Sequence, residues 1–319
     1  MRDTLSQVAL VLGVNGQDGS FAAETLLQRG YAVYGTGRQE HPTWVERTEK
    51  FTYIRLDLRE TQAIERLMDN LRPDLILHLA AAHTSSGFSE APLADDFLSV
   101  NVLSLQAVLM AMVRQGGDAR LVYAGSSHVF GLPPPEHVNL RSPRRPHNIY
   151  AVSKILAADL VESYRRKHGL PVSVLYFFNH ESERRPGDFF IPRLISGLKK
   201  TLDQQDYVFK LASLDFQCDW GCAREYMDIA VDVATRSPGK DFLVATGRSV
   251  SGRELAERLF AEMGLDYRKH IITETSSSIG NPFFASLDEL HSALGRTPVR
   301  TVFDVCHDML AFCHQEKAA

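Results

Sequence analysis

The sequence predicts an α/β fold in which a doubly wound parallel sheet is followed by a smaller C-terminal lobe. Short apolar runs of strand length alternate with longer stretches of helical spacing over the first 180 residues. The runs are apolar almost throughout, as strands buried on both faces are. A glycine-rich turn also separates the first run from the first helical stretch. Together these observations favour parallel strands joined by helices that cover both faces of the sheet.

Six apolar runs are the predicted strands, at 8–14, 32–36, 51–56, 75–81, 120–125 and 172–178. Helices are predicted between most of them, at 19–29, 61–70, 95–114 and 148–168. Beyond residue 180 the pattern loosens, and polar segments with proline and glycine separate shorter helical pieces. We therefore expect one lobe over residues 1–180 and a second over residues 181–319, with room for the chain to cross between them.

The composition excludes several classes of protein. A net charge of −4, with both signs mixed along the chain, offers no basic surface for nucleic acid or for an anionic membrane. No run of 18 apolar residues is present, so we predict no membrane-spanning helix and expect a cytoplasmic protein. Cysteines are too few for a disulfide framework, and we expect buried thiols and no metal site at positions 218, 222, 306 and 313.

The glycine-rich turn reads GVNGQDG and lies between the first predicted strand and the first predicted helix. One glycine allows the tight turn, one lets a pyrophosphate approach the backbone, and one allows the strand and helix to pack closely. The spacing is GxxGxxG, and a purely structural turn is the alternative. Its position between strand and helix favours a Rossmann-type dinucleotide site. The expected cofactor contacts are Gly13, Asn15, Gly16, Gln17, Asp18 and Gly19.

The end of the second predicted strand indicates which dinucleotide binds. Arg38 follows it, and a guanidinium suits the 2′-phosphate of NADP where a carboxylate would suit NAD. Glu40 lies close enough to weaken that preference, so NAD stays open as the alternative. Residues after the third strand are placed to meet the adenine, and small residues after the fourth let a cofactor lie against the backbone. These further candidate contacts are Asp57, Leu58, Leu79, Ala80, Ala81 and His83.

Two residues four positions apart predict an oxidation–reduction site. Tyr150 and Lys154 share one face of the predicted helix 148–168. A nearby ammonium lowers the pKa of a phenol, so we expect Tyr150 to exchange a proton near neutral pH. Ser126 follows the strand predicted over 120–125 and is expected to bind the same substrate oxygen. Serine, tyrosine and lysine beside a nicotinamide would interconvert a secondary alcohol and a ketone.

Longer segments of the chain resemble a known family. The segments are 13–31 (GVNGQDGSFAAETLLQRGY), 176–195 (YFFNHESERRPGDFFIPRLI), 213–227 (SLDFQCDWGCAREYM) and 242–255 (FLVATGRSVSGREL). They resemble the GDP-mannose 4,6-dehydratases of the extended short-chain dehydrogenase/reductase superfamily. The resemblance implies a sugar-nucleotide substrate, hydride transfer at C4 with NADP, and a homodimer or homotetramer. It also implies that His180 and Arg185 contact the cofactor and that Asn179 contacts the substrate phosphates.

The row Ser126-Ser127-His128 departs from that family, which has glutamate at the third position. In the family reaction C4 of the sugar is oxidised, and the glutamate then removes the C5 proton and helps to expel the C6 hydroxyl as water. An imidazole also moves protons near neutral pH, but it differs from a carboxylate in reach and charge. We therefore favour epimerisation or keto-sugar reduction. The alternatives are a dehydratase with His128 as the base, a merely packed His128, and a non-catalytic cofactor-binding regulator.

Two arginines that this family uses on the nucleotide diphosphate are replaced here. Cys218 stands in the place of the first and Asn281 in the place of the second. Charge-assisted bidentate contacts are strong, so their loss weakens substrate binding unless other cations take over. We expect such replacements among Arg184, Arg193 and Arg224, and we count Ser127 as a further substrate contact.

Overall fold

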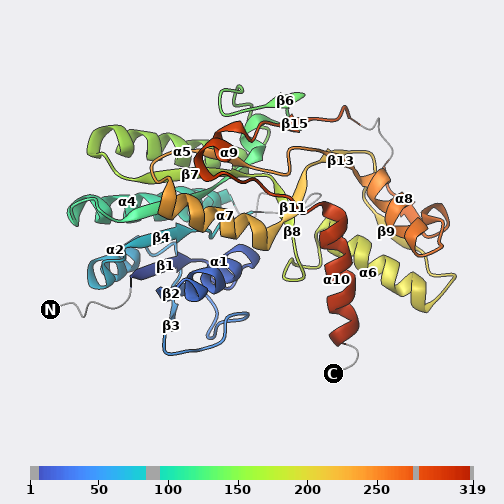
Figure 1. Cartoon of the computed structure of the whole chain (residues 1–319), viewed down its shortest axis with the longest axis horizontal. Helices are drawn as coiled ribbons and strands as arrows, with labels where there is room; N and C mark the ends of the chain where they lie inside the picture. The colour runs from blue at the N-terminus through green and yellow to red at the C-terminus, as the bar shows by residue number, and fades with distance from the viewer. Residues whose placement is uncertain (1–6, 84–93, 276–279, 317–319) are drawn as a thin grey trace.

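The computed structural model describes residues 7–83, 94–275 and 280–316. Its centre is a sheet of seven parallel strands (Figure 1). The predicted fold class is confirmed, and all six predicted strands are present. In spatial order the strands are β12 (Phe242–Val244), β7 (Val172–Phe177), β5 (Arg120–Ser126), β4 (Leu75–His78), β1 (Val8–Leu12), β2 (Ala32–Gly37) and β3 (Phe51–Arg55).

Helices cover both faces of this sheet. One face packs against α1 (Gln17–Gln28), α7 (Ala223–Arg236) and α9 (Asp288–Leu294), and the other against α2 (Thr61–Leu71), α4 (Ser104–Arg114) and α5 (Ile149–His168). Alternate residues of a strand supply the two cores. In β1, Ala9 and Val11 belong to the first core and Leu10 and Leu12 to the second. All four are fully buried, which explains why the strand reads as one continuous apolar run.

The helix predicted over 95–114 is divided in the structure. It begins as α3 (Ala94–Leu98), widens into a π-helical turn, η2 (Ser99–Leu103), and continues as α4. Asn101 lies in this wide turn and is fully buried. Its amide group donates to the Ala82 carbonyl and to Ser153 Oγ, and its oxygen accepts from the Ala82 N–H. The turn therefore ties the segment after β4 to α5, and π turns of this kind are frequent at functional sites.

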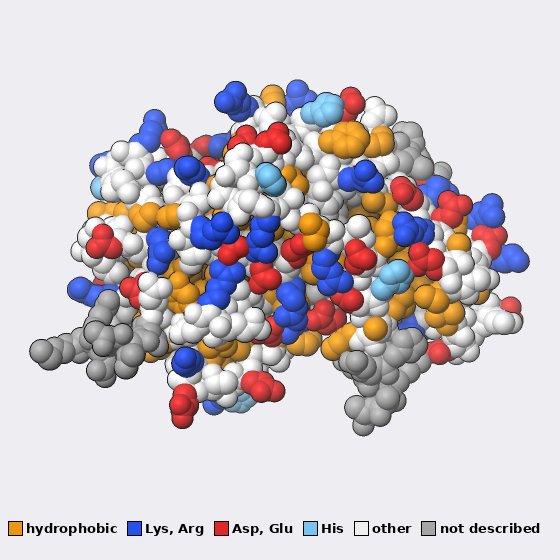
Figure 2. Space-filling view, viewed as in Figure 1, with side chains coloured by type: hydrophobic (Ala, Val, Ile, Leu, Met, Phe, Trp, Pro, Cys, Tyr) orange, Lys and Arg blue, Asp and Glu red, His pale blue; other side chains and the backbone are white. Residues whose placement is uncertain are grey.

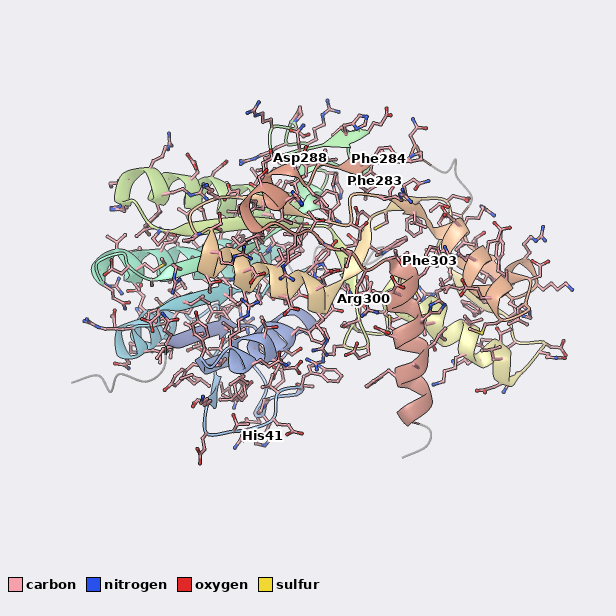
Figure 3. The ribbon with its side chains drawn as sticks, in the orientation of Figure 1. His41, Phe283, Phe284, Asp288, Arg300 and Phe303 are labelled. Atoms are coloured by element: carbon pink, nitrogen blue, oxygen red, sulfur yellow. The ribbon has the colours of Figure 1, made fainter. Side chains whose placement is uncertain are left out.

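A separate apolar core forms the smaller lobe, at the right of Figure 1. It is built by α6 (Phe190–Asp203), α8 (Gly252–Glu262) and α10 (Val302–Glu316). Phe303, labelled in Figure 3, joins this core from the first turn of α10. Short strand pairs complete the molecule: β8 (Asn179–Glu181) with β11 (Trp220–Cys222), β9 (Phe209–Leu211) with β14 (Ile271–Thr273), β10 (Gln217–Cys218) with β13 (Val250–Ser251), and β6 (His137–Val138) with β15 (Phe284–Ala285).

The chain crosses between the two lobes more than once. After α6 it returns through α7 to the sheet, where β12 pairs with the outer edge of β7. It then enters the smaller lobe at α8, comes back at β15 and α9, and leaves again in α10. Residue 180 therefore marks only the first crossing. The sequence did not reveal β12 because it has three residues and lies where the strand–helix alternation has already loosened.

The order of the strands reverses beside β1, which lies between β2 and β4. Connections leave in opposite directions there, and a crevice forms at the carboxyl ends of the strands. The turn after β1 is unusually close-packed. Gly13 has a φ of +96°, and a Cβ atom on it would lie 2.8 Å from Ala80. A Cβ atom on Gly19 would lie 2.1 Å from the Gly13 carbonyl oxygen, so α1 can start here only with glycine.

The surface carries charges of both signs, and one helical segment of the described chain is long and apolar. Basic and acidic side chains are interspersed on the face shown in Figure 2. Asp95–Arg114 is long and apolar enough to cross a membrane by length and composition. Half of this apolar stretch is buried inside the protein, however, as in a core helix of a globular fold.

Gly19→Ala tests the close contact between β1 and α1. The added methyl group meets a carbonyl carbon and oxygen that cannot rotate away, so we expect the free energy of unfolding to fall by about 1–3 kcal/mol. Urea denaturation measures the change. Gly187→Ala is the matched control because no atom lies within 4 Å of the position that its methyl group would take, and its stability should stay within about 0.5 kcal/mol of the parent. Equal stabilities of the two variants would contradict this account.

Candidate active site

A cavity of about 600 Å³ opens at the carboxyl ends of the parallel strands. Its size lies within the range of small-molecule and cofactor sites. It brings together every cofactor contact predicted from the sequence, together with Ser126, His128 and Asn179. The predicted cofactor residues on its wall are Gly13, Asn15, Gly16, Gln17, Asp18, Gly19, Arg38, Asp57, Leu58, Leu79, Ala80, Ala81, His83, Tyr150, Lys154, His180 and Arg185.

One end of the cavity is formed by the glycine turn and the loop after β2. The Asn15 amide group donates to Gln39 Oε1 and to the His41 carbonyl, both at 3.0 Å, and its oxygen accepts from the Thr43 N–H. Asn15 thus fastens the loop that contains His41, which is labelled in Figure 3. Arg38 is exposed beside this loop, and its guanidinium makes no hydrogen bond or ion pair with the described residues.

A buried ion pair lies at the start of α1. His180 Nε2 is 2.9 Å from Asp18 Oδ1, and His180 Nδ1 is 2.7 Å from the Phe178 carbonyl. Both neighbours are acceptors, so a doubly protonated imidazole fits them. Burial alone would raise the Asp18 pKa, but the charge and hydrogen bond of His180 outweigh it, and the pKa falls to about 2. Burial likewise opposes the charge on His180, yet Asp18 raises its pKa above the ordinary value.

The other end of the cavity holds Ser126, Tyr150 and Lys154. Asn148 caps α5 by accepting from the Ala151 N–H at 2.8 Å, which places Tyr150 in the first helical turn. Ser126 is the last residue of β5 and lines the same cavity. Lys154 is only 1% exposed, and its Nζ donates to the Ala124 carbonyl at 2.7 Å and to Tyr123 Oη at 3.2 Å.

The expected lowering of the Tyr150 pKa is wrong for this structure. Burial is the largest influence on the phenol and raises its pKa. A hydrogen bond with Ser126 and the charge of Arg185 act in the opposite direction but do not overcome burial. Burial also lowers the pKa of Lys154 to about 7, so its ammonium is a weaker partner than an exposed lysine would be. Tyr150 therefore holds its proton at neutral pH.

His128 belongs to η3 (Ser127–Phe130), the 3₁₀ turn that follows β5. Its ring meets the Tyr150 ring edge-on, with centroids 5.6 Å apart, and lies 5.2 Å from the His147 ring. Its Nδ1 is buried and has no hydrogen-bond partner within the described residues. Burial, and next the neighbouring His147, lower the pKa of His128 to about 4. The imidazole is therefore neutral at physiological pH, and its ring lies against that of Tyr150.

Four predicted substrate contacts do not line the cavity. Ser127 lies one residue beyond Ser126 but is absent from the cavity wall. Arg184 donates to Glu24 and Ser20, and Arg224 donates to Glu24 from the other side, so both cations face α1. Arg193 is exposed and donates to the Lys210 carbonyl. The two positions where the family has arginine, Cys218 and Asn281, are also outside the cavity wall.

Several residues of the site were not identified from the sequence. Asn101 holds the cavity wall at Ala82, Tyr123 receives the Lys154 hydrogen bond, and Phe189 stacks under the Arg185 guanidinium at 3.7 Å. One signal was readable: Asn101 is a polar residue inside an apolar helical stretch. Tyr123 offered none, because a tyrosine within a buried strand looks like any core aromatic.

The cysteines form no metal site within the part of the chain that the structure describes, where no cluster of three potential ligands occurs. Cys222 and Cys306 lie in the core of the smaller lobe, and the side chain of Cys313 is outside the described part. Burial raises the pKa of the Cys218 thiol well above its ordinary value, and Asp219 and Glu181 add to the effect. Cys218 is thus a neutral thiol at a position where the resemblance led us to expect an arginine.

Asp18→Asn tests the ion pair with His180. The Asp18 pKa is depressed in the folded state, so its stabilisation is present above the ordinary carboxyl pKa and is lost as the pH falls toward 2. The variant should lose about 2 kcal/mol of unfolding free energy at pH 7 and show a flatter dependence between pH 4 and 2. Urea denaturation at several pH values measures both. Asp69→Asn, an exposed carboxylate in a long ion pair, is the control and should keep the parent's profile.

Comparison with known proteins agrees with this geometry. The family model described as GDP-mannose 4,6 dehydratase matches residues 10–282. GDP-mannose 4,6 dehydratase 2 of Caenorhabditis elegans is 32% identical over 274 residues, which cover 81% of this chain and 71% of that protein. The human GDP-mannose 4,6 dehydratase is 30% identical over 274 residues, or 81% and 72% of the two chains.

Solved structures share the fold at lower identity. A putative epimerase from Burkholderia cenocepacia has a TM-score of 0.82 at 22% identity and covers 99% of this chain and 100% of its own. The dTDP-glucose 4,6-dehydratase of Bacillus anthracis, solved with NAD, has a TM-score of 0.82 at 16% identity and covers 98% of both chains. With its family-model match, its parallel sheet and its Ser126–Tyr150–Lys154 cavity, this chain is a nucleotide-sugar-modifying enzyme of the extended short-chain dehydrogenase/reductase superfamily and belongs to the GDP-mannose 4,6-dehydratase family.

Proposed function

We propose that this enzyme acts at C4 of a GDP-linked sugar, either by reducing a 4-keto sugar to the alcohol or by epimerising the C4 hydroxyl, with NADP as its cofactor and without the loss of water. The observation that carries the proposal is the composition of one cavity. A protonated phenol, a serine hydroxyl and a buried lysine line it, and a neutral imidazole occupies the position where the family has a carboxylate. The first three groups serve oxidation and reduction of a secondary alcohol, whereas the dehydration step depends on the fourth.

The protonation of Tyr150 supports the reductive direction. A ketone that is reduced needs a proton on its oxygen, and a phenol that holds its proton at neutral pH is a ready donor. Ser126 donates a second hydrogen bond to the same oxygen, and Lys154 holds a positive charge close by. A bound nicotinamide would supply or accept the hydride. Epimerisation at C4 needs the same groups, used once in each direction, and no base at C5.

The environment of His128 argues against efficient dehydration. A general base works best when its pKa lies near the operating pH, and burial holds the pKa of His128 near 4. A base that is already neutral but binds protons weakly abstracts a carbon-bound proton slowly. Positive charge on His128 would also be opposed by His147 and His83. His128 is therefore better suited to form a hydrogen bond with the substrate as a neutral group than to accept a proton from it.

The residues of the cavity fit a dinucleotide. Gly16 is the N-cap residue of α1 and offers no side-chain cap, which leaves the first amide groups of the helix to an anion such as a pyrophosphate. The negative charge of Asp18 in that turn is balanced by His180 and Arg185. Arg38 follows β2 and is exposed on the cavity wall beside the glycine turn. Its guanidinium suits a 2′-phosphate and supports NADP over NAD. Asn179 from β8 is the candidate contact for the substrate phosphates.

A dehydratase in which His128 is the base is the second candidate. One observation favours it: His128 Nδ1 is buried without a partner among the described residues, while the ring faces Tyr150 across the cavity. A substrate proton would satisfy that nitrogen. In this case activity should fall as the pH drops through about 4, since the base must be neutral, and not near the ordinary histidine value of 6.5.

We also propose a cytoplasmic homo-oligomer. Large apolar side chains are exposed on two neighbouring helical segments, where contact with a second copy would remove them from water. They are Leu98 and Leu103, each 46% exposed, and Val152 and Leu156, at 42% and 45%.

Product analysis of the parent and three variants tests the proposed reaction. With NADPH and a GDP-linked 4-keto sugar, the parent should consume NADPH, and NMR of the product should show a secondary alcohol at C4. Tyr150→Phe should slow turnover by about 10²–10⁴-fold because the proton donor is lost. His128→Gln should retain most of the reductive activity. His128→Glu restores the carboxylate and should add a 6-methyl signal when GDP-mannose and NADP are supplied. A 6-methyl product from the parent itself would establish the second candidate instead.

Arg38→Asp tests the choice of cofactor. The change places a carboxylate where a 2′-phosphate would bind, so the dissociation constant for NADP should rise at least about tenfold while that for NAD changes little. Isothermal titration with each dinucleotide measures both constants. Arg66→Asp makes the same change of charge on the exposed side of α2 and should leave both constants unaltered. Equal losses for NADP and NAD in Arg38→Asp would show that Arg38 does not bind the 2′-phosphate.

A further inference from the structure

A chain of hydrogen bonds runs beneath the candidate active site, away from the cavity. Lys154 Nζ donates to Tyr123 Oη at 3.2 Å, and Tyr123 Oη donates to the Asn101 carbonyl at 2.8 Å. Tyr123 and Asn101 are fully buried, and Lys154 is 1% exposed. Because the phenol proton is engaged with a carbonyl, the Tyr123 oxygen faces Lys154 as an acceptor. The backbone carbonyl of Asn101 therefore determines which group donates and which accepts in each of these hydrogen bonds.

These contacts show where two of the three N–H groups of the Lys154 ammonium donate. An ammonium has three N–H groups. One donates to the Ala124 carbonyl at 2.7 Å and one to Tyr123, both inside the protein. Lys154 also lines the cavity, so the third is the one left to point toward a bound molecule. The Tyr123 ring lies 4.7 Å below Nζ and supports the same position through a cation–π contact.

We propose that Tyr123 is a positioning residue: its hydroxyl group holds the Lys154 ammonium so that one N–H faces the cavity. The proposal deepens the function proposed above, in which Lys154 assists proton transfer by Tyr150. Tyr123 acts through Lys154 and touches neither substrate nor cofactor.

The other groups around Lys154 leave this task to Tyr123. His78 of β4 lies beside the Tyr123 ring at 5.3 Å, but its Nε2 is engaged with Ser104 Oγ at 2.7 Å. Burial, and next Lys154 itself, lower the His78 pKa to about 3, so the imidazole is neutral. Asp18 of α1 stabilises the ammonium through space, the Tyr150 ring centroid lies 5.7 Å from Nζ, and Lys154 disfavours charge on His83. None of these contacts supplies the acceptor that the Tyr123 hydroxyl provides.

The same series of hydrogen bonds also holds the cavity wall at Ala82 in place. Asn101, whose carbonyl receives the Tyr123 proton, also holds both backbone groups of Ala82 with its side-chain amide. It binds Ser153, the neighbour of Lys154 on α5, as well. One hydrogen-bond network therefore links Lys154 and Tyr123 to Asn101 and, through it, to the cavity wall after β4. Removal of the Tyr123 hydroxyl frees the ammonium while the amide contacts of Asn101 keep the wall in place.

Tyr123→Phe tests the proposal by a direct titration of Lys154. The variant keeps the ring beneath Nζ and removes only the acceptor oxygen. Carbon-13 NMR of lysine labelled at Cε reports each lysine pKa, and Lys154→Met identifies the Lys154 signal. The Lys154 pKa, about 7 in the parent, should fall by about one unit, because the charged form loses a hydrogen bond. Tyr31→Phe removes a buried phenol at the opposite, amino-terminal end of β2 and should leave the titration unchanged.

Turnover supplies a second readout that a merely structural role would not move. If the ammonium form of Lys154 is needed, its pKa sets an alkaline limb of the rate profile. In Tyr123→Phe this limb should move about one pH unit downward with KM unchanged. A uniform loss of rate with an unmoved limb, or an unmoved Lys154 titration, would overturn the proposal. Since the NMR titration needs no substrate, absence of activity on sugar nucleotides would count against the proposed function alone.

A second variant guards against misfolding of Tyr123→Phe. Site-specific replacement of Tyr123 by 3-fluorotyrosine keeps the hydroxyl and nearly the same volume, while the fluorine makes the oxygen a poorer acceptor. The Lys154 pKa should fall in the same direction but by less than in Tyr123→Phe. An unchanged or raised Lys154 pKa in this protein would also overturn the proposal.

Discussion

The contact between the turn after β1 and the first turn of α1 is the constraint on which the rest of this structure depends. Gly13 and Gly19 bring the strand and the helix so close that no side chain fits between them. This approach aims the start of α1 at the carboxyl ends of the sheet, at the point where the strand order reverses. The glycine-lined end of the cavity and the Asp18–His180 pair at the start of α1 follow from that placement.

Burial decides the charge of almost every group at this cavity. Tyr150 keeps its proton, His83 and His128 remain neutral, and Lys154 titrates near 7. The Asp18–His180 pair stays charged because each partner stabilises the other. A phenol that holds its proton and a lysine bound by a tyrosine hydroxyl and a backbone carbonyl are the groups that the proposed reduction needs in order to donate a proton. The neutral imidazole of His128 is the reason why the proposed reaction omits dehydration.

Much of the fold was predictable because its signals are local. Continuous apolar runs predicted six strands, and the glycine spacing predicted the turn between β1 and α1. Tyr150 and Lys154 were identified because a helix places residues four apart on one face. The strand β12 was missed since three apolar residues carry no periodicity, and the division of the 95–114 helix was missed because a π turn leaves little trace in composition.

The sequence by itself determined the fold class, the glycine turn and the residue types of the acid–base site, because each depends on neighbours along the chain. Only the tertiary structure decided which titratable side chains are charged at neutral pH. The Tyr150 pKa was expected to fall and instead rises, since the loss of hydration outweighs the charges and hydrogen bonds that lower it. Arg184 and Arg224 were expected near the substrate and instead face Glu24 on α1, which lies 160 residues before Arg184 in the chain. Tyr123 is hydrogen-bonded to Asn101 and Lys154, which belong to two other elements. Burial and long-range pairing depend on residues distant in sequence, and a linear pattern does not encode their distances.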